Sequence, residues 1–358
     1  MSAQNDPRAE LLSGVRVLDL SRLLPGPFAT KLLADMGAQV DKIEDPGAGD
    51  YLRQMPPRPK DGHNRAFAFL NGGKRSAVLD LKSQVGREAL LRILPSYDVL
   101  LESFRPGVMA RLGLGPDVLF ERHPSLVLCS ISAYGQAGPL ADRPGHDLNC
   151  VARSGVLALS GPADGAPQTP PMQLADTASG LYAALTIVAA LRRGKAVHLD
   201  ISMAEAAASF GVFGFATATA PRGADVLTGG LAIYRCYETS DGKYMSLACL
   251  EEKFWRAFCD ATGTAFRKEA LIPGPHQPAL VDEFRALFRT QTQAEWTAVG
   301  EQAACCLEPV LTPSELLSDP QSRFRNTYDG ERLSTPAAPA SPRPAPAQGE
   351  HTDEIVPG

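Results

Sequence analysis

Apolar and polar residues alternate in the N-terminal part of the chain, to about residue 135, in the pattern of an α/β protein. Val15–Leu20 and Gln39–Ile43 are apolar runs typical of buried strands, and Phe28–Met36 between them has helical spacing. This helix is predicted to end at Gly37, because glycine is favoured just past a helix C-terminus. Strand, helix and strand within about thirty residues form a βαβ unit, which requires a parallel sheet.

The same alternation resumes after a loop at residues 45–65 that is rich in proline, glycine and charge. The further predicted elements are strands at 76–81, 98–101 and 126–132, with helices at 84–94 and 106–111. This succession predicts an open α/β sheet of Rossmann type. No G-x-G-x-x-G follows the first strand, so the dinucleotide fingerprint is absent and hydride transfer is disfavoured.

Beyond residue 145 the predicted elements are a helix at 151–159, a loop at 161–171, a helix at 176–191, a strand at 197–201 and a helix at 203–218. Asp176, followed by Thr-Ala-Ser, has the position of an N-cap for the 176–191 helix. His146 and Asp176 both stand where a loop meets an element. Side chains at such junctions can face a cleft while the elements behind them stay packed.

A smaller α+β domain is predicted next. Two strands, Leu231–Thr239 and Lys243–Leu250, flank Asp241-Gly242, a strong hairpin signal. Predicted helices follow at Glu251–Thr262, 281–289 and 293–301. We therefore divide the chain into a large Rossmann-like domain at 1–224, a small domain at 225–308, and a segment at 309–358 that returns to the large domain. The Ala/Pro-rich stretch 337–346 is expected to be extended.

Composition narrows the class of protein. The chain has 358 residues, 44% hydrophobic and 21% charged, and Lys+Arg 35 against Asp+Glu 40 gives a net charge of −5. This balance argues against a nucleic-acid-binding protein, for which a basic excess is typical. The seven cysteines lack C-x-x-C spacing, so neither a zinc site nor a disulfide framework is indicated.

The sequence predicts no association with a membrane. Met1–Glu10 is polar, without the apolar region of a secretory signal, and the longest aliphatic run, Leu181–Leu191, is short for a bilayer span. A cytoplasmic location is the expectation.

Several stretches together resemble one family, the class III CoA-transferases and their relatives (CaiB/BaiF-like proteins). Each stretch is short, and their shared order over nearly the whole chain carries the resemblance. Within the superfamily, Gly145-His146-Asp147-Leu148-Asn149 is more similar to the α-methylacyl-CoA racemase branch than to the transferases. The other matching stretches are residues 17–22, 25–30, 33–38, 73–76, 79–82, 104–108, 134–139, 228–230, 247–251 and 349–355.

The resemblance implies an interlocked homodimer and a reaction. A racemase removes and replaces the α-proton of an acyl-CoA thioester, which needs bases on opposite faces and stabilisation of the enolate. By resemblance, His146 and Asp176 are the two bases, Glu251 orients His146, and the backbone N–H of Asp147 binds the enolate oxygen. Each residue also has a structural interpretation: a loop histidine, an N-cap at Asp176, and an acid favoured in the first turn at Glu251.

Cations and helix N-termini are expected to hold the CoA phosphates. One departure from the racemases is Asp45, which stands after the second strand where they commonly carry an arginine; Lys42 is its candidate substitute. No metal and no permanently bound cofactor are expected, since coenzyme A enters as part of the substrate. The predicted CoA-binding residues are Lys42, Lys74, Arg75, Leu79, Asp80, Leu81, Lys82, Arg105, Arg111, Gly145, Leu148 and Asn149.

Two other functions stay open. In a CoA-transferase the carboxylate of Asp176 would carry an aspartyl-CoA thioester and pass the CoA to a second acid. A catalytically silent CoA-binding or scaffold protein would lose nothing on substitution of Asp176. The histidine at 146 favours the racemase over the transferase. The acyl group is not specified by the sequence; Met172, Met203, Leu227 and Ile233 are candidate lining residues, each equally suited to a core.

Overall fold

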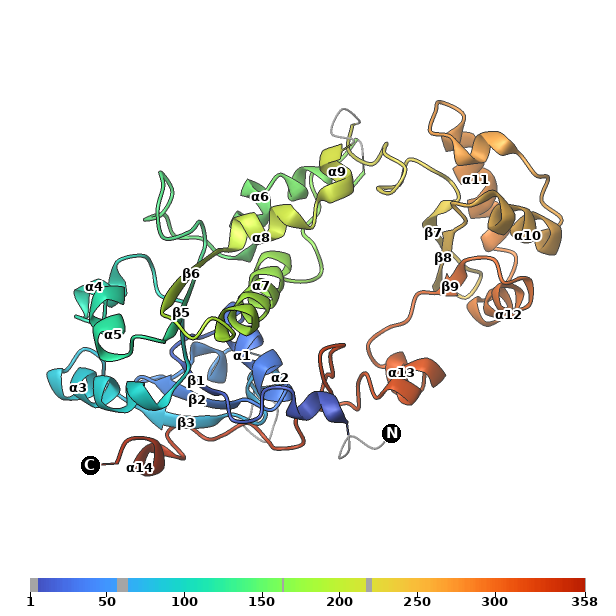
Figure 1. Cartoon of the computed structure of the whole chain (residues 1–358). Helices are drawn as coiled ribbons and strands as arrows, with labels where there is room; N and C mark the ends of the chain where they lie inside the picture. Colours follow the sequence, from blue (N-terminus) through green and yellow to red (C-terminus); the bar gives the residue numbers. More distant parts are fainter. Residues whose placement is uncertain (1–5, 57–63, 163, 217–220, 358) are drawn as a thin grey trace. The chain divides into compact units, whose positions relative to one another are not determined.

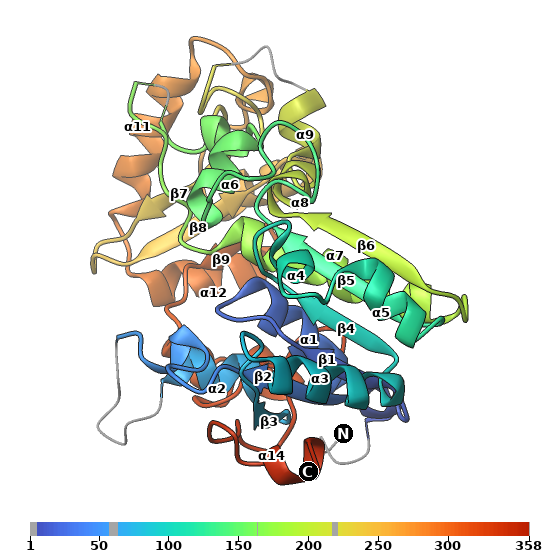
Figure 2. The same ribbon diagram turned by 90° about the vertical axis from the view of Figure 1, so that its left-hand side faces the viewer.

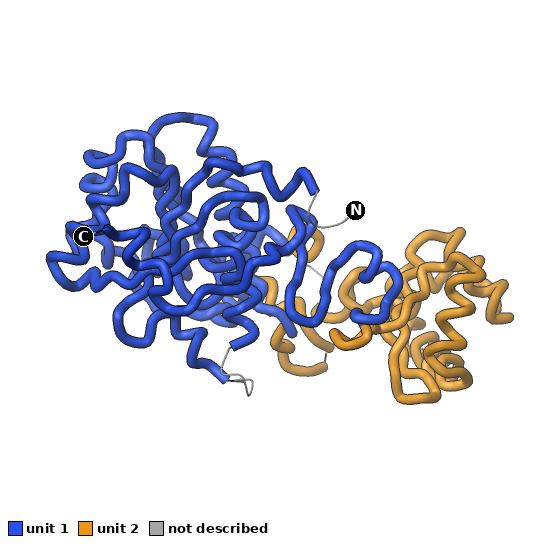
Figure 3. Tube along the Cα trace, turned by 90° about the horizontal axis from the view of Figure 1, so that it is seen from below, with its two compact units in different colours: residues 1–154, 171–210, 316–358 blue, residues 155–170, 211–315 orange. Residues whose placement is uncertain are grey.

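The computed structural model describes residues 6–56, 64–162, 164–216 and 221–357. These residues form two compact units, coloured separately in Figure 3. The first unit comprises residues 1–154, 171–210 and 316–358, and the second comprises 155–170 and 211–315. The second unit thus begins near residue 211 and also includes 155–170, whereas the sequence suggested a single small domain at 225–308.

The first unit is built on a six-stranded sheet. Its order is β3-β2-β1-β4-β5-β6, and every neighbouring pair is parallel. This is the strand order of a doubly wound Rossmann sheet, in which the direction of winding reverses between β1 and β4. The predicted α/β fold class is confirmed. The strands are β1 (Arg16–Asp19), β2 (Gln39–Glu44), β3 (Arg75–Val78), β4 (Val99–Glu102), β5 (Val127–Ser132) and β6 (Val197–Ser202).

Helices cover both faces of this sheet, as parallel strands require. In Figure 2 helices α3, α4 and α5 lie in front of the sheet and α1 and α7 lie behind it. The front layer shares a core with the sheet, in which Leu90, Met109 and Leu119 join Leu18 and Leu100. The helices of this unit are α1 (Pro25–Asp35), α2 (Arg65–Asn71), α3 (Gln84–Ile93), α4 (Val108–Arg111), α5 (Pro116–Arg122), α6 (Asp147–Arg153), α7 (Leu174–Leu191), α8 (Met203–Ser209), α13 (Pro320–Arg325) and α14 (Thr352–Ile355).

Helix α7 is the long apolar helix of the first unit. Its 18 residues would also be long and apolar enough to cross a membrane. Here it packs against α1 and α8 and against strands β5 and β6. Gly180 makes the approach to α1 possible, because a Cβ at this position would lie 2.6 Å from the Pro25 carbonyl oxygen. These contacts fit a core helix of an α/β unit.

The C-terminal segment returns to the first unit, as the sequence suggested. Helix α14 lies beside β3 at the edge of the sheet (Figure 1), where the His351 N–H donates to the Ser76 carbonyl. Ile355 is buried in the same core as α3. The extended Ala/Pro-rich stretch between α13 and α14 crosses near α1, since the Ser341 N–H donates to the Asp35 carboxylate.

The second unit has a three-stranded antiparallel sheet in the order β7-β8-β9. The predicted hairpin is present, with Gly242 in a left-handed conformation at its turn. An aromatic core that includes Trp255, Phe284, Phe288 and Trp296 holds the helices on this sheet. The elements are β7 (Tyr234–Glu238), β8 (Tyr244–Ala248), β9 (Leu307–Pro309), α9 (Val212–Ala216), α10 (Glu252–Thr262), α11 (Gln277–Phe288) and α12 (Gln293–Ala303).

Candidate functional site

A cavity of about 840 Å³ in the first unit brings together two of the predicted catalytic side chains, His146 and Asp176. Most of its wall is apolar and comes from the loop after β1, the segment after β2, and α2. Ligand sites in proteins commonly have such an apolar wall with a few polar groups. The remaining lining residues are Leu23, Leu24, Leu52, Met55, Pro56, Asn64, Arg65, Ala66, Leu70 and Gln173.

Asp176 lies in the first turn of α7, which begins at Leu174. It is therefore not the N-cap that its sequence context suggested. The cap is supplied instead by Asp147, whose Oδ1 accepts the N–H of Ala175 at 2.7 Å and that of Asp176 at 3.0 Å. The carboxylate of Asp176 has no such local task and lines the cavity.

The environment of the Asp176 carboxyl group raises its pKa toward neutral pH. Burial, and secondly the nearby charge of Asp147, raise its pKa to about 7. Both effects act against the ionised form, because a desolvated carboxylate is costly and a second carboxylate repels it. Strongly shifted acids in a cavity are candidates for proton transfer.

His146 stands at the N-cap position of α6, and Asp147 is the first residue of that helix. The His146 N–H donates to Asn149 Oδ1 at 3.1 Å, which fixes the backbone at the helix start. A Cβ at Gly145 would lie 3.0 Å from the Tyr134 hydroxyl oxygen. Glycine therefore lets this segment pack closely against Ala133 and Tyr134, the two residues that follow β5. Leu148 is 43% exposed. Asp147 thus begins a helix four residues before the one expected at 151–159.

Glu251 belongs to the second unit, where it is the N-cap residue of α10. Its carboxylate lies 2.9 Å from the ammonium of Lys253, and both side chains are exposed. The helix thus begins one residue later than the sequence suggested. The structure describes the surroundings of Glu251 within its own unit, and its predicted role beside His146 stays a prediction.

A second cavity, of about 490 Å³, lies at the carboxyl ends of β1, β2, β3 and β4. Open parallel sheets bind ligands at this edge, where the strand order reverses. Four of the predicted CoA-binding residues, Leu79, Asp80, Leu81 and Lys82, line it together, and Lys42 lines it too. Asp45, the departure noted in the sequence, also faces this cavity.

The predicted phosphate ligands Lys42, Lys74 and Arg75 are largely used within the protein, which differs from the prediction. The Lys74 ammonium is fully buried and bonds to Asp19, Thr30 and Asn71. Burial, opposed by the carboxylate of Asp19, lowers the pKa of Lys74 to about 8. Lys42 is also buried, in an ion pair.

Arg75 makes a two-pronged contact with Asp41, at 2.8 Å from each carboxylate oxygen. Its guanidinium also pairs with Glu354 of α14. Arg105 lines a separate, small cavity of about 60 Å³ beside Glu102. Arg111 is exposed in the last turn of α4. Among the described residues no cluster of His, Cys, Asp and Glu could hold a metal ion.

The apolar wall of the larger cavity was missed in the sequence. The proposed lining residue Met172 is 58% exposed and Met203 is buried in α8, and neither faces the cavity. The wall instead comes largely from Leu23 and Leu24, just before the Pro25 start of α1, and from Leu52. The available signal was the apolar pair Leu23-Leu24 directly before Pro25, the first residue of α1. These residues lie in the loop after β1, and loops after parallel strands commonly contribute to ligand sites.

Comparison with known proteins agrees with this arrangement. The chain is 35% identical to human alpha-methylacyl-CoA racemase, over 96% of this chain and 92% of the human protein. It is 33% identical to the acetyl-CoA:oxalate CoA-transferase of Acetobacter aceti, over 87% and 84% of the two chains. The crystal structure of a CAIB/BAIF family protein from Brucella suis superimposes with a TM-score of 0.83 at 27% identity, covering 96% of this chain and 98% of that one.

The sequence model of CoA-transferase family III matches residues 12–352, nearly the whole chain. This range includes both cavities and the second unit. The relatives include racemases and transferases, so the match defines the superfamily and leaves the reaction to be argued from the site. The chain belongs to CoA-transferase family III.

Proposed function

We propose that this enzyme racemises (epimerises) 2-methylacyl-CoA thioesters by 1,1-proton transfer through an enolate. The observation that carries the proposal is the pairing of His146 and Asp176 in one largely apolar cavity, with the pKa of Asp176 raised to about 7. A group with a pKa near the working pH can both accept and return a proton, as a reversible 1,1-transfer requires.

The proposed reaction uses the two side chains in turn. One of them removes the α-proton, leaving an enolate, and the conjugate acid of the other delivers a proton to the opposite face of the same carbon. The N–H of Asp147 opens α6 and is the proposed donor to the enolate oxygen. Glu251 is proposed to orient His146 in the assembled homodimer.

The two cavities suggest where the two ends of the substrate bind. The larger one offers leucine, methionine and proline side chains around the two bases, which suits a branched or aryl acyl group. The second lies where an α/β sheet commonly receives a nucleotide, which suits the adenosine end of CoA. Coenzyme A enters as part of the substrate, and no permanent cofactor is proposed.

A CoA-transferase is the second candidate, supported by the 33% identity to an oxalate CoA-transferase. In that reaction the carboxylate of Asp176 attacks the donor thioester and then carries CoA as an aspartyl thioester to the acceptor acid. The imidazole of His146 lies in the same cavity as Asp176, and the transferase reaction has no need of a second acid–base group there. This is why we prefer proton transfer.

Deuterium exchange separates the two reactions. Each enantiomer of a 2-methylacyl-CoA is incubated with the enzyme in D₂O without any acceptor acid. We expect deuterium at the α-carbon together with loss of optical purity. Hydroxylamine-trappable enzyme-bound CoA without deuterium at the α-carbon would instead establish the transferase.

Variants assign the two bases. Asp176→Asn and His146→Gln should each lower racemisation by roughly 10²- to 10⁴-fold, the usual contribution of one acid–base group. Each variant should still exchange the α-proton of one enantiomer, and the two variants should retain opposite enantiomers. Matched controls are Asp117→Asn, an exposed acid in the first turn of α5, and His276→Gln, the N-cap histidine of α11. Racemisation that survives in both active-site variants would refute the assignment.

A further inference from the structure

The cavity at the carboxyl ends of β1 to β4 has an unusual charge balance for a site that would receive a polyanion. Its lining includes three cationic side chains, Arg22, Lys42 and Lys82. It also includes the acids Glu44, Asp45, Asp50 and Asp80. What matters for a phosphate is which of these charges are already neutralised within the protein.

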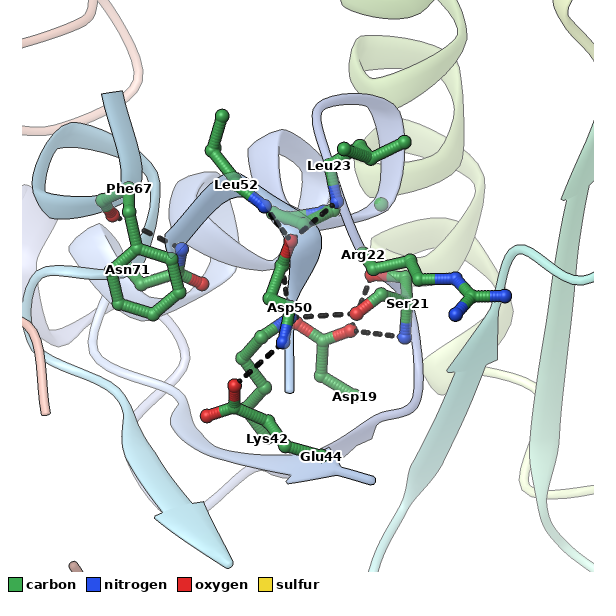
Figure 4. A network of polar contacts seen from close by, with 12 residues as sticks. Asp19, Ser21, Arg22, Leu23, Lys42, Glu44, Asp50, Leu52, Phe67 and Asn71 are labelled. Carbon is green, nitrogen blue, oxygen red and sulfur yellow. Dashed lines mark hydrogen bonds and ion pairs between the residues drawn. The ribbon is translucent and has the colours of Figure 1, made fainter. Parts of the chain in front are cut away.

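One of the three cations, Lys42, is already neutralised within the protein. Lys42 is completely buried, its ammonium lies 2.9 Å from Asp50 Oδ2, and it donates to the Ser21 carbonyl at 2.6 Å. Burial alone would lower the pKa of Lys42, but the carboxylates of Asp19 and Asp50 outweigh it and raise the pKa. Figure 4 shows this lysine enclosed beside Asp50. Lys42 and Asp50 therefore cancel.

The other two cations are available to a ligand. The Arg22 guanidinium points away from the buried network in Figure 4 and lies over the rings of Tyr51, at 4.5 Å, and Phe104, at 5.8 Å. Lys82 is exposed, and in the described part of the chain its ammonium has no acidic partner. The cavity therefore offers two free positive charges.

Two of the acids are also free of cations. Glu44 is neutralised, since Arg53 contacts it at 2.8 and 2.7 Å. Asp45, by contrast, accepts backbone N–H groups, from Gly47 at 2.9 Å and Gly49 at 3.3 Å. Asp80 likewise accepts the Lys82 N–H at 3.0 Å. Both side chains are exposed, and neither pairs with a cation of the described residues.

The free charges of this cavity consequently sum to zero, two positive against two negative. A phosphomonoester carries about −1.5 to −2 charge at neutral pH, and the pyrophosphate bridge of CoA adds more. We expect Arg22 and Lys82, the two free cations, to pair with the pyrophosphate. An additional phosphate meets the opposing carboxylates of Asp45 and Asp80, so the protein gains little by binding it.

We propose that Asp45 and Asp80 make this site indifferent to the 3′-phosphate of CoA, so that the enzyme takes acyl thioesters of dephospho-CoA as readily as those of CoA. The inference rests on the proposed function in one respect, that the ligand is a CoA-type thioester. It goes further by stating that the 3′-phosphate of CoA contributes little to binding, and that Asp45 and Asp80 are the cause.

Binding without chemistry tests this directly. The affinities of CoA and of dephospho-CoA are measured by titration calorimetry on the whole chain, at two salt concentrations. We expect the two dissociation constants of the wild type to agree within about threefold, with a weak salt dependence. The double variant Asp45→Asn/Asp80→Asn should favour CoA by about tenfold, which corresponds to about 1.4 kcal/mol, because the repulsion is gone.

The asparagine side chains keep the oxygen acceptors that Gly47, Gly49 and Lys82 use, so the local turns are retained. Asp117→Asn removes an equally exposed carboxylate outside the cavity and should leave the affinity ratio unchanged. Circular dichroism and thermal unfolding of each variant verify folding. Asp45→Arg serves as a second measurement and should shift the preference toward CoA further than Asp45→Asn does.

The outcomes separate this inference from the proposed function. A wild type that binds CoA tenfold or more tightly than dephospho-CoA overturns the inference, whatever the exchange assay shows. Equal affinities with no deuterium exchange support the inference and refute the racemase. Binding of neither compound refutes both. Equal affinities that stay equal in the double variant refute the role given to Asp45 and Asp80.

Discussion

Asp147 shows how one residue can serve the site twice. Its carboxylate accepts the Ala175 and Asp176 N–H groups, and so anchors the start of α7 beside the start of α6. The same charge lies close enough to Asp176 to oppose its ionisation. The sequence suggested only the backbone N–H of Asp147 as functional. Its side-chain role depends on contact between residues 28 and 29 positions apart, which no local pattern reveals.

Substitution of Asp147 should separate its structural role from its electrostatic one. Asp147→Asn retains an oxygen that can cap α7 but removes the charge, so the pKa of Asp176 should fall from about 7 while its burial keeps it above the ordinary value. Because Asp176 acts as a base only when ionised, the rising limb of the pH–exchange profile should move to lower pH, by about one unit.

Asp147→Ala provides the contrast, since it removes both the charge and the cap. It should lower the free energy of unfolding by roughly 1 to 2 kcal/mol, the usual effect of losing an N-cap. An exchange profile that stays at the same pH in Asp147→Asn would contradict the electrostatic role. Unchanged stability in Asp147→Ala would contradict the structural one.

The cationic residues mark where prediction of the site from sequence ends. Lys74 and Arg75 lie in a stretch that resembles CoA-binding proteins, yet their side chains bond to Asp19 and Asp41. A lysine in a loop and a lysine in a buried network have the same local sequence. Leu79 to Lys82 follow β3 and line the second cavity, because the ends of parallel strands meet at one edge of the sheet. Their CoA binding, which the resemblance implies, stays a prediction.

At the scale of elements, strongly periodic segments were predicted well and short ones were not. The helix at 84–94 and the strand at 126–132 correspond closely to α3 and β5. The helix at 151–159 differs: α6 occupies 147–153, and a separate short helix follows Gly155, whose φ of 84° breaks the chain direction. The helix at 203–218 ends at Ser209, with α9 following; residues 217 and 218 lie outside the described residues.

Five helices and strands were absent from the prediction altogether: α2, α5, α13, α14 and β9. Each is at most seven residues long. Such segments contain too few turns or alternations for a period to emerge, and tertiary packing decides their conformation. Asn64 did offer a signal for α2, since it caps the helix by accepting the Phe67 N–H.

The segment after β2 is an element whose conformation depends on one buried ion pair. Asp50 Oδ1 accepts the N–H groups of Leu23 and Leu52, both at 3.0 Å, while Oδ2 lies 2.9 Å from the Lys42 ammonium (Figure 4). Leu23 needs this support, because its φ of 66° is unfavourable for a leucine. Since Leu23 and Leu52 line the larger cavity and Asp50 the second, the segment joins the walls of both.

Asp50→Asn should therefore destabilise the first unit. Asparagine keeps the acceptor for Leu23 and Leu52 but places an amide against the ammonium of Lys42, which loses one of its buried partners. Breaking a buried pair in this way costs about 3 kcal/mol. Urea unfolding followed by circular dichroism measures the loss.

The double variant Lys42→Met/Asp50→Asn is the matched control. It removes the buried charge that the single variant leaves unpaired, and should recover most of the lost stability. If Asp50→Asn unfolds at the same urea concentration as the wild type, the ion pair does not hold this segment.

At the scale of the whole molecule, the sequence predicts the kind of sheet but not its order. Hydrophobic alternation identifies β1 to β5, and strand–helix–strand succession makes them parallel. It cannot place β4 rather than β3 next to β1, because that choice depends on which way each crossover turns. The order fixes which loops meet at the reversal point, and hence that residues after β1, β2 and β3 share one cavity.

Assembly is the last level at which the site can be tested. His146 and Asp176 line one cavity of the first unit, whereas Glu251 belongs to the second unit. If the partner chain supplies Glu251 in the proposed homodimer, co-expression of His146→Gln and Glu251→Gln chains should produce mixed dimers with one intact site each. With random pairing this restores roughly a quarter of wild-type racemase activity, although each homodimer alone is impaired.

Co-expression of His146→Gln with Asp176→Asn is the control and should restore nothing, since both residues line one cavity of the same chain. Equal, low activity in both mixtures would show that a single chain supplies Glu251 to its own His146.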